Sequence, residues 1–572
     1  MGLPFLPLAL AAALQWLDPS AVKPQQRGVC VTEWSGGERR EIPVEVMGTL
    51  DAVAPGRSAV LVRLLDDRLT GSGVVAGMSG SPVYVDGKLL GAVAFGWSFA
   101  REPLAGVTPF ETMHKLEPGG GSAGAPAPTV AQLAALADGH LEPMAILPDL
   151  PSHGGGEPQL AALGGLPEPS GFAAKLLERL GLQTVPAGGG APGEGPPEPG
   201  EMLAVPLVWG DATLAAGGTV TAREGDKVWA FGHPLFNLGK VRMPAVRARV
   251  LAIQGSYQNP FKIFAVGKSF GTLVVDRAAG IVALAGAAPA GIPVTIDVHG
   301  PMGDATWHFR MVEEPLLAQS MVTYLTNASL TSRGAGVGQA SARIAMKVDL
   351  ADGRSVSLDQ SGRGLDILAR IAAFAGGVVG ALANSPFAHP AVAGVEMRLD
   401  RDEEARGAVI AEALPARTVV APGEALSVEV RLQPEHAAVE SRRLTLRVPP
   451  DAEPGPVDLI VADGAAWSEY RLRAEGLMPA DFADQLAELG LLESSATLVG
   501  VLVGHARGVA VPGASQPDLP PSWAATVATG LGPRSVTRLG SSVLAITRVP
   551  AGMPLEGAFR IPLTVRPRVE AP

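Results

Sequence analysis

The sequence has a single cysteine, Cys30, among its 572 residues. One cysteine permits neither an internal disulfide nor a cysteine-based metal cage, so the folded parts must depend on their hydrophobic cores. We expect Cys30 to be a small buried residue, with a free thiol or a cross-link between two chains as the alternatives. No His-x-x-x-His pair or carboxylate cluster indicates a metal site, and we expect no cofactor.

Positive charge is scarce as well. The chain carries 45 lysines and arginines against 56 aspartates and glutamates, which gives a net charge of -11 at pH 7. Binding to nucleic acid requires a basic surface that neutralises phosphates, so this composition argues against nucleic acid as a partner.

Long hydrophobic runs are few. Residues 365–383 are apolar but include Asp366 and Arg370, which predicts a buried or surface-packed helix rather than a membrane span. Residues 3–14 are too few for a membrane anchor, and we interpret residues 1–20 as a signal peptide, although the first basic residue is Lys23. The protein is therefore expected in the periplasm, the envelope or the medium; peripheral membrane association and the oligomeric state stay open.

Aromatic residues make up 5% of the chain and charged residues 18%, whereas 71 glycines and 51 prolines are present. This composition is typical of many short strands joined by turns, and it predicts a mainly β protein. The length leaves room for three or four domains.

The most informative motif is Gly-Met-Ser-Gly-Ser-Pro at residues 77–82. A nucleophilic serine must stand clear of the backbone beside main-chain amides that stabilise an oxyanion, and glycine permits both the tight turn and the close approach. Ser79 is the candidate nucleophile because Gly77 precedes it by two residues and Gly80 follows it directly; Ser81 is the competitor. The amides of Gly77 and Ser79 are the candidate oxyanion hole, and a turn without chemistry is the alternative.

A serine nucleophile needs a base, and His233 is the best placed of nine histidines. It follows the alternating run at residues 228–231, which predicts a strand that could aim the imidazole, and it precedes Pro234. A core or turn histidine without a catalytic role is the alternative.

The serine motif and the residues after it, 77–93, resemble the SpoIVB-type serine peptidases, a chymotrypsin-like group. Residues 218–221 and 229–234 look like the histidine segment of that family, and residues 270–281 extend the resemblance. Better-known members place histidine before serine, whereas here serine comes first. A catalytic triad is defined by geometry and roles rather than chain order, so the reversed order can still assemble one.

The resemblance places the orienting acid just before the nucleophile loop, where Asp66 is the candidate. An ordinary turn carboxylate is the alternative for Asp66. Asp276 and Asp226 are the substitutes if Asp66 faces solvent.

The resemblance implies a two-lobed chymotrypsin-like β-barrel domain followed by accessory β-sandwich-like domains. It also implies an exported bacterial serine endopeptidase that acts through an acyl-enzyme on a narrow polypeptide substrate, such as an envelope protein. A non-catalytic scaffold that binds envelope proteins or peptides is the alternative, and self-cleavage in a glycine-proline segment is a variant of the first function.

Residues 300–360 are expected to form alternating strands, and strict alternation at residues 426–432 predicts a β-sandwich. Together with low-complexity stretches, these patterns divide the chain as follows: 1–20 signal peptide, 27–116 serine-bearing lobe, 117–200 Gly/Pro-rich linker with short helices, 201–300 histidine-bearing lobe, 301–405 β-rich extension with an apolar helix, 406–475 β-sandwich-like module, and 476–572 C-terminal α+β region.

Overall fold

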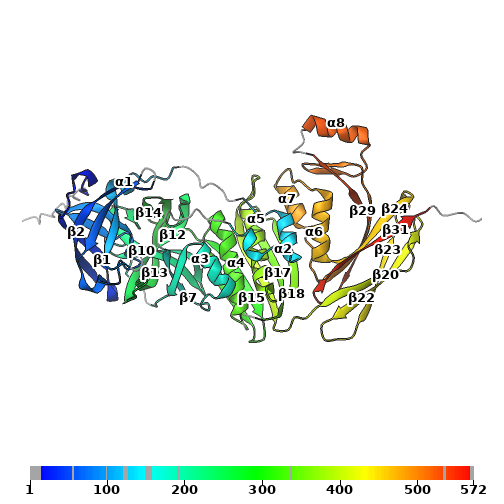
Figure 1. The fold of residues 1–572 in the computed structure, drawn as a ribbon, viewed down its shortest axis with the longest axis horizontal. Coiled ribbons are helices and arrows are strands. Elements are labelled where there is room, and N and C mark those ends of the chain that lie inside the picture. Colours follow the sequence, from blue (N-terminus) through cyan, green and yellow to red (C-terminus); the bar gives the residue numbers. More distant parts are fainter. Residues whose placement is uncertain are drawn as a thin grey trace, which may run out of the picture.

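The chain folds into β-rich units that follow one another along the long axis of the molecule (Figure 1). The structure, a computed structural model, describes residues 14–54, 57–97, 100–119, 126–148, 158–189, 193–334, 336, 338–531 and 536–566. Most of the expected signal peptide, residues 1–13, lies outside this part. Trp16 and Leu17 are described, and both pair with Leu89 on the first barrel.

The first unit is a closed antiparallel barrel in the order β1-β2-β3-β6-β5-β4. Its interior holds mostly branched aliphatic side chains and Cys30, which suits strands that alternate between core and surface. The strands are β1 (Arg27–Glu33), β2 (Arg39–Ala54), β3 (Arg57–Leu64), β4 (Pro82–Val85), β5 (Lys88–Phe95) and β6 (Leu104–Pro109), with short helices η1 (Pro19–Ala21), η2 (Ser35–Gly37), η3 (Asp67–Leu69) and α1 (Phe110–His114).

A second barrel lies within a sheet of thirteen strands. Its six strands pair in the order β9-β12-β13-β14-β11-β10, and an additional pairing of β10 with β9 closes the ring. The strands are β9 (Met202–Gly210), β10 (Thr213–Glu224), β11 (Lys227–Ala230), β12 (Gly239–Gln254), β13 (Phe261–Arg277) and β14 (Gly280–Ala285). These two barrels and the sheets that follow confirm the predicted mainly β fold with chymotrypsin-like barrels.

The segment expected to be a linker takes part in the folded core. Its strand β7 pairs with β10 and its strand β8 pairs with β7, so both extend the large sheet. Its helix α2 packs against α5 and α6, which come from much later in the chain (Figure 1). The elements of this segment are α2 (Val130–Ala137), η4 (Pro143–Ile146), β7 (Gln159–Gly164), α3 (Gly171–Arg179) and β8 (Leu182–Pro186).

Residues 292–402 continue the large sheet and add two buried helices. The expected apolar helix is α5, whose residues are nearly all buried. Within the described residues, no helix combines the length and the apolar character that a membrane crossing requires. The elements are β15 (Ile292–His299), β16 (Ala305–Met311), α4 (Pro315–Thr331), β17 (Ala340–Leu350), β18 (Ser355–Gly364), α5 (Ile367–Ala383) and β19 (Val392–Asp402).

Helix α4 corrects the expectation of continuous strands between residues 300 and 360. Fifteen of its 17 residues are buried, including Gln319, Thr323 and Tyr324. A helix that is buried all around has no polar face, so its sequence lacks the amphipathic period that identifies a helix. Its close neighbour α5 presents Gly376, where a Cβ atom would lie 1.9 Å from Thr323 Oγ1.

The C-terminal unit is built around two sheets, in the orders β23-β22-β20-β30 and β21-β31-β24-β25-β29. The alternating run at residues 426–432 lies in β22, as predicted, and its sandwich also uses strands from the end of the chain. The elements are β20 (Ala408–Pro415), β21 (Val419–Val420), β22 (Ala425–Pro434), β23 (Glu440–Arg447), β24 (Gly455–Asp463), α6 (Gly464–Glu475), α7 (Phe482–Leu489), β25 (Thr497–His505), β26 (Val509–Val511), β27 (Ala514–Gln516), α8 (Pro521–Leu531), β28 (Thr537–Arg538), β29 (Ser541–Pro550), β30 (Leu555–Glu556) and β31 (Ala558–Val565).

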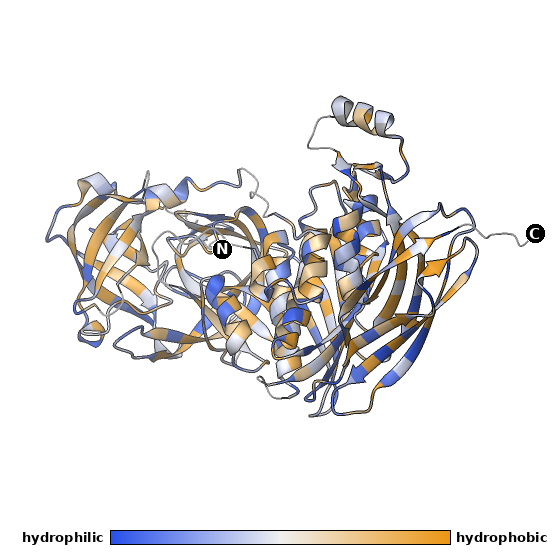
Figure 2. Cartoon of the chain, turned by 45° about the vertical axis from the view of Figure 1, so that its right-hand side comes forward, coloured by the Kyte–Doolittle hydropathy of each residue, from blue (hydrophilic) through white to orange (hydrophobic). Residues whose placement is uncertain are grey.

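Hydrophobic residues follow the strands and the packed helices, whereas hydrophilic residues gather at loops and hairpin ends (Figure 2).

The two barrels are joined by a buried carboxylate. Glu33 of β1 is 3% exposed, and its Oε2 and Oε1 accept hydrogen bonds from Met202 N at 2.8 Å and Val250 N at 2.7 Å in the second barrel. This side chain satisfies two main-chain amides that water cannot reach.

We expect Glu33→Gln to lower the free energy of unfolding by about 2 kcal/mol, because the new amide nitrogen would face a main-chain donor instead of accepting from it. Urea denaturation measures the loss. Glu38→Gln, at an exposed position of the neighbouring turn, is the matched control and should change stability little. Equal stabilities of the two variants would contradict the role of Glu33 in holding the barrels together.

Candidate active site

The serine motif lies in a loop that precedes β4 in the first barrel. Gly77 and Gly80 both have φ of 96°, a left-handed conformation that side chains other than glycine adopt at a cost. A Cβ atom on Gly80 would also lie 1.8 Å from Thr219 O of the second barrel. The glycines therefore permit both the turn and the close contact between the barrels.

Every peptide of this loop is fixed through its carbonyl. Four successive carbonyl oxygens accept hydrogen bonds: Ala76 O from Lys262 N at 3.1 Å, Gly77 O from Thr219 Oγ1 at 2.8 Å, Met78 O from Ser81 N at 2.9 Å, and Ser79 O from Thr219 N at 2.7 Å. Because C=O and N–H point in opposite directions across a trans peptide, these bonds also set the direction of each amide.

Two amides of the loop remain available. Met78 N donates to Val75 O at 2.9 Å and Gly80 N donates to Val93 O at 2.7 Å. In the part of the chain that the structure describes, the amides of Gly77 and Ser79 donate no hydrogen bond. They are the pair that the sequence assigns to the oxyanion hole, and they are the kind of fixed, unpaired donors that such a site requires.

The two serines of the motif differ in exposure. Ser79 is half-buried at the surface of the loop, whereas Ser81 is fully buried. The Ser81 hydroxyl donates to Thr32 Oγ1 at 2.9 Å inside the first barrel. A substrate can therefore approach Ser79 but not Ser81.

His233 lies in the loop between β11 and β12 of the second barrel. The expected strand at residues 228–231 ends at Ala230, because Phe231 has φ of 73° and Gly232 has φ of 70°. A left-handed, fully buried phenylalanine is strained by about 1–3 kcal/mol, and such strain is concentrated at functional sites. His233 Nδ1 lies 2.8 Å from Pro234 O, a contact that favours the tautomer with the proton on Nδ1.

The serine and histidine loops meet through Thr219 of β10. Thr219 N donates to Ser79 O, and Thr219 O accepts from Phe231 N at 3.3 Å. Thr108 of the first barrel adds a direct link, because its Oγ1 donates to Gly232 O at 2.7 Å. The fold therefore brings Ser79 and His233, which are far apart in the sequence, to the junction of the two barrels.

The three candidate acids have different surroundings. Asp276 is fully buried on β13, and its carboxylate accepts hydrogen bonds from three amides directly after His233: Leu235 N at 2.7 Å, Phe236 N at 2.7 Å and Leu238 N at 3.2 Å. Asp66 caps its own short turn by accepting from Arg68 N at 2.9 Å, and Asp226 is exposed at a hairpin turn. Asp276 is thus the carboxylate that holds the histidine loop, while a catalytic role for Asp66 stays a prediction.

These loops have the composition and the links that a serine peptidase requires, and a comparison with protein families bears on the same segment. Residues 20–111 match the family model of SpoIVB peptidase S55. The predicted resemblance to SpoIVB-type serine peptidases is thereby confirmed. The match includes Ser79 and ends before the histidine-bearing barrel. Neither a curated protein nor a solved structure matches the chain.

Sequence patterns did not point to a lysine that packs against the loop that carries Ser79. Lys262 of β13 is fully buried, and its Nζ donates to Thr32 Oγ1 at 2.9 Å and to Thr219 Oγ1 at 3.4 Å. Burial lowers the pKa of Lys262 to about 8, against the opposing effects of Glu33 and Cys30. The sequence does contain a signal that Lys262 is buried, because strand alternation places it on the same face of β13 as the buried Phe264.

Cys30 lies in the core of the first barrel with no exposed surface. Burial raises the pKa of its thiol to about 12. This position agrees with the expected small buried residue and not with a reactive thiol or a cross-link between chains.

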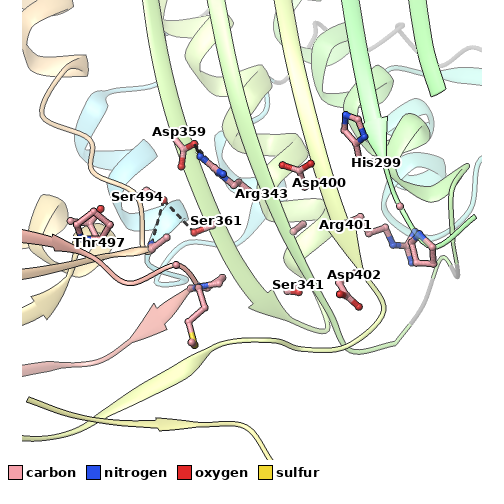
Figure 3. Close-up of a pocket in the computed structure, with 18 of the residues that line it drawn as sticks. His299, Ser341, Arg343, Asp359, Ser361, Asp400, Arg401, Asp402, Ser494 and Thr497 are labelled. Atoms are coloured by element: carbon pink, nitrogen blue, oxygen red, sulfur yellow. Dashed lines mark hydrogen bonds and ion pairs between the residues drawn. The ribbon is translucent and has the colours of Figure 1, made fainter. Parts of the chain in front are cut away.

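A separate cavity of about 830 Å³ lies between the large sheet and the C-terminal unit (Figure 3). Strands of the sheet contribute charged side chains to it, and Arg343 pairs with Asp359 at 2.6 Å. Neither Ser79, His233 nor any of the candidate acids lines this cavity.

One group of possible metal ligands is found among the described residues: Asp138, His140 and Glu469. His140 Nδ1 lies 2.6 Å from Glu469 and 3.2 Å from Asp138, and Arg473 also pairs with Glu469. The group is already joined by ion pairs between α6 and the segment after α2, so its arrangement is explained without a metal.

We expect Asp276→Asn to lower the rate at which a fluorophosphonate probe labels the protein by about 100-fold or more, because the new side-chain NH2 would face main-chain N–H groups of the histidine loop that now donate to the carboxylate. Asp66→Asn keeps an oxygen for its turn and should label within about threefold of wild type. Thermal unfolding identifies any general loss of structure. The opposite ranking of the two variants would assign the acid to Asp66.

Lys262 should make stability depend on pH. Its pKa of about 8 in the folded protein lies below the value of about 10.5 expected in the unfolded chain, so between these values the unfolded state binds more protons. Through Lys262, the free energy of unfolding should therefore rise by about 3 kcal/mol between pH 8 and about pH 10.5. The raised pKa of Cys30 has the opposite effect above its ordinary value of about 9, so the quantity to measure is the difference in stability between wild type and Lys262→Met. Urea denaturation should show that wild type gains about 3 kcal/mol relative to Lys262→Met across this range. Parallel curves for the two proteins would contradict the assignment.

Proposed function

We propose that the protein is an exported serine endopeptidase that cleaves a polypeptide, such as an envelope protein, through an acyl-enzyme. The observation that carries this proposal is the pair of unpaired amides at Gly77 and Ser79, held beside an accessible serine and tied through Thr219 to the histidine loop. The family match supports the same class of enzyme.

In this mechanism His233 Nε2 takes the proton from Ser79 Oγ as the oxygen attacks a peptide carbonyl. The amides of Gly77 and Ser79 stabilise the oxyanion of the tetrahedral intermediate. His233 then protonates the leaving amine, and it later activates the water that hydrolyses the acyl-enzyme. Asp276 would hold the histidine loop in position throughout these steps.

The proposed location outside the cytoplasm is supported by the apolar residues 3–14. The accessory units are large compared with the two barrels, which fits a regulatory enzyme with a narrow substrate better than a digestive one. Within this proposal, the C-terminal sandwich would hold the substrate protein or its partner.

We expect the purified protein to react with a fluorophosphonate probe at Ser79. Ser79→Ala should abolish labelling and His233→Ala should lower its rate by about 1,000-fold or more, because one removes the nucleophile and the other its base. Mass spectrometry of the labelled peptide identifies the modified residue. Ser72→Ala, in the same segment before β4, is the control and should label like wild type.

Absence of labelling in folded wild-type protein would contradict the enzyme and favour the non-catalytic scaffold. Labelling at Ser81 instead would overturn the assignment of the nucleophile.

A further inference from the structure

We propose that Lys262 is a positioning residue of the oxyanion hole, because it fixes the two peptides that flank the Cα atom of Gly77. This inference rests on the proposed function and assigns a role to a buried group outside the triad.

The first contact is made by the main chain of Lys262. Its amide donates to Ala76 O at 3.1 Å, and Ala76 N in turn donates to Pro260 O at 2.8 Å, so the loop pairs with the start of β13. The peptide group between Ala76 and Gly77 contains both the Ala76 carbonyl and the Gly77 N–H. Holding this carbonyl on β13 turns the Gly77 N–H away from β13.

The second contact is made by the side chain. An ammonium group has three donors and no acceptor, so Thr219 Oγ1 must accept from Lys262 Nζ. The single hydroxyl proton of Thr219 is then left for Gly77 O, which lies 2.8 Å away. Lys262 thus determines which way the Thr219 hydroxyl points, and the hydroxyl fixes the peptide after Gly77.

Packing adds a third constraint. A Cβ atom on Gly77 would lie 3.0 Å from Lys262 Cδ, so the loop rests directly on the lysine stem. Burying an ammonium group costs free energy that a methionine of similar length would avoid. The hydrogen bonds from Lys262 to Thr32 and Thr219 offset part of that cost. The same hydrogen bonds fix the loop that carries Gly77.

A double-mutant cycle tests this role, with the rate of fluorophosphonate labelling as the measurement. Thr219→Val should slow labelling by about 10- to 100-fold, because Gly77 O loses its donor, and Thr219→Ser should restore the rate to within about threefold of wild type. Lys262→Met should slow labelling to a similar degree. The variant with both Lys262→Met and Thr219→Val should be no slower than either alone, because both changes interrupt one chain of hydrogen bonds.

Two results would overturn the inference: labelling of folded Lys262→Met at the wild-type rate, or losses that multiply in the double variant. Thermal unfolding of each variant separates loss of structure from loss of positioning. If wild type itself is not labelled, the proposed function fails and this inference fails with it, whereas a reactive wild type with an equally reactive Lys262→Met overturns this inference alone.

A second measurement keeps the test decisive if Lys262→Met does not fold. In wild type, the labelling rate should fall as pH rises through about 8, because a neutral amine donates weaker hydrogen bonds than an ammonium group. Among the described residues, the titratable groups that act on Lys262 are Cys30 and Glu33 of β1, while the loop and β10 contact it through Gly77 and Thr219, which do not titrate. Thermal unfolding at each pH shows whether the protein is still folded, and a constant labelling rate in folded protein up to pH 10 would overturn the inference.

Discussion

The candidate site depends on Thr219, a residue of the second barrel whose main chain and side chain bind the loop of the first barrel that carries Ser79. Its amide and hydroxyl hold the carbonyls of Ser79 and Gly77, and its carbonyl holds Phe231 N ahead of His233. One residue therefore sets the position of the serine loop and of the histidine loop at the same time. The buried carboxylate of Glu33 keeps the two barrels in the register that this contact requires.

Much of this arrangement could be predicted from local sequence. The glycine spacing around Ser79 encodes a turn that only glycine permits, and His233 follows a short alternating strand. The alternating residues of β22 also identified that strand correctly. The strand β22 could be identified because its consecutive residues alternate between an exposed and a buried face.

The remaining features depend on contacts between distant segments, which no local pattern reveals. Helix α4 is buried on all sides, so it shows neither the helical nor the strand period. Residues 159–186 look like parts of a spacer, yet β7 and β8 complete the large sheet by pairing with β10 and with each other. The importance of Asp276 becomes evident only when the loop after His233 folds over its carboxylate.

The order of the two barrels along the chain has a consequence for biogenesis. The serine-bearing barrel is synthesised first, but the groups that hold Gly77 and Ser79 in place, Thr219 and Lys262, follow more than a hundred residues later. Under the proposed function, a nascent or prematurely ended chain that contains only the first barrel would carry Ser79 without an ordered oxyanion hole and without His233. The serine would then stay inert until the second barrel has emerged and docked.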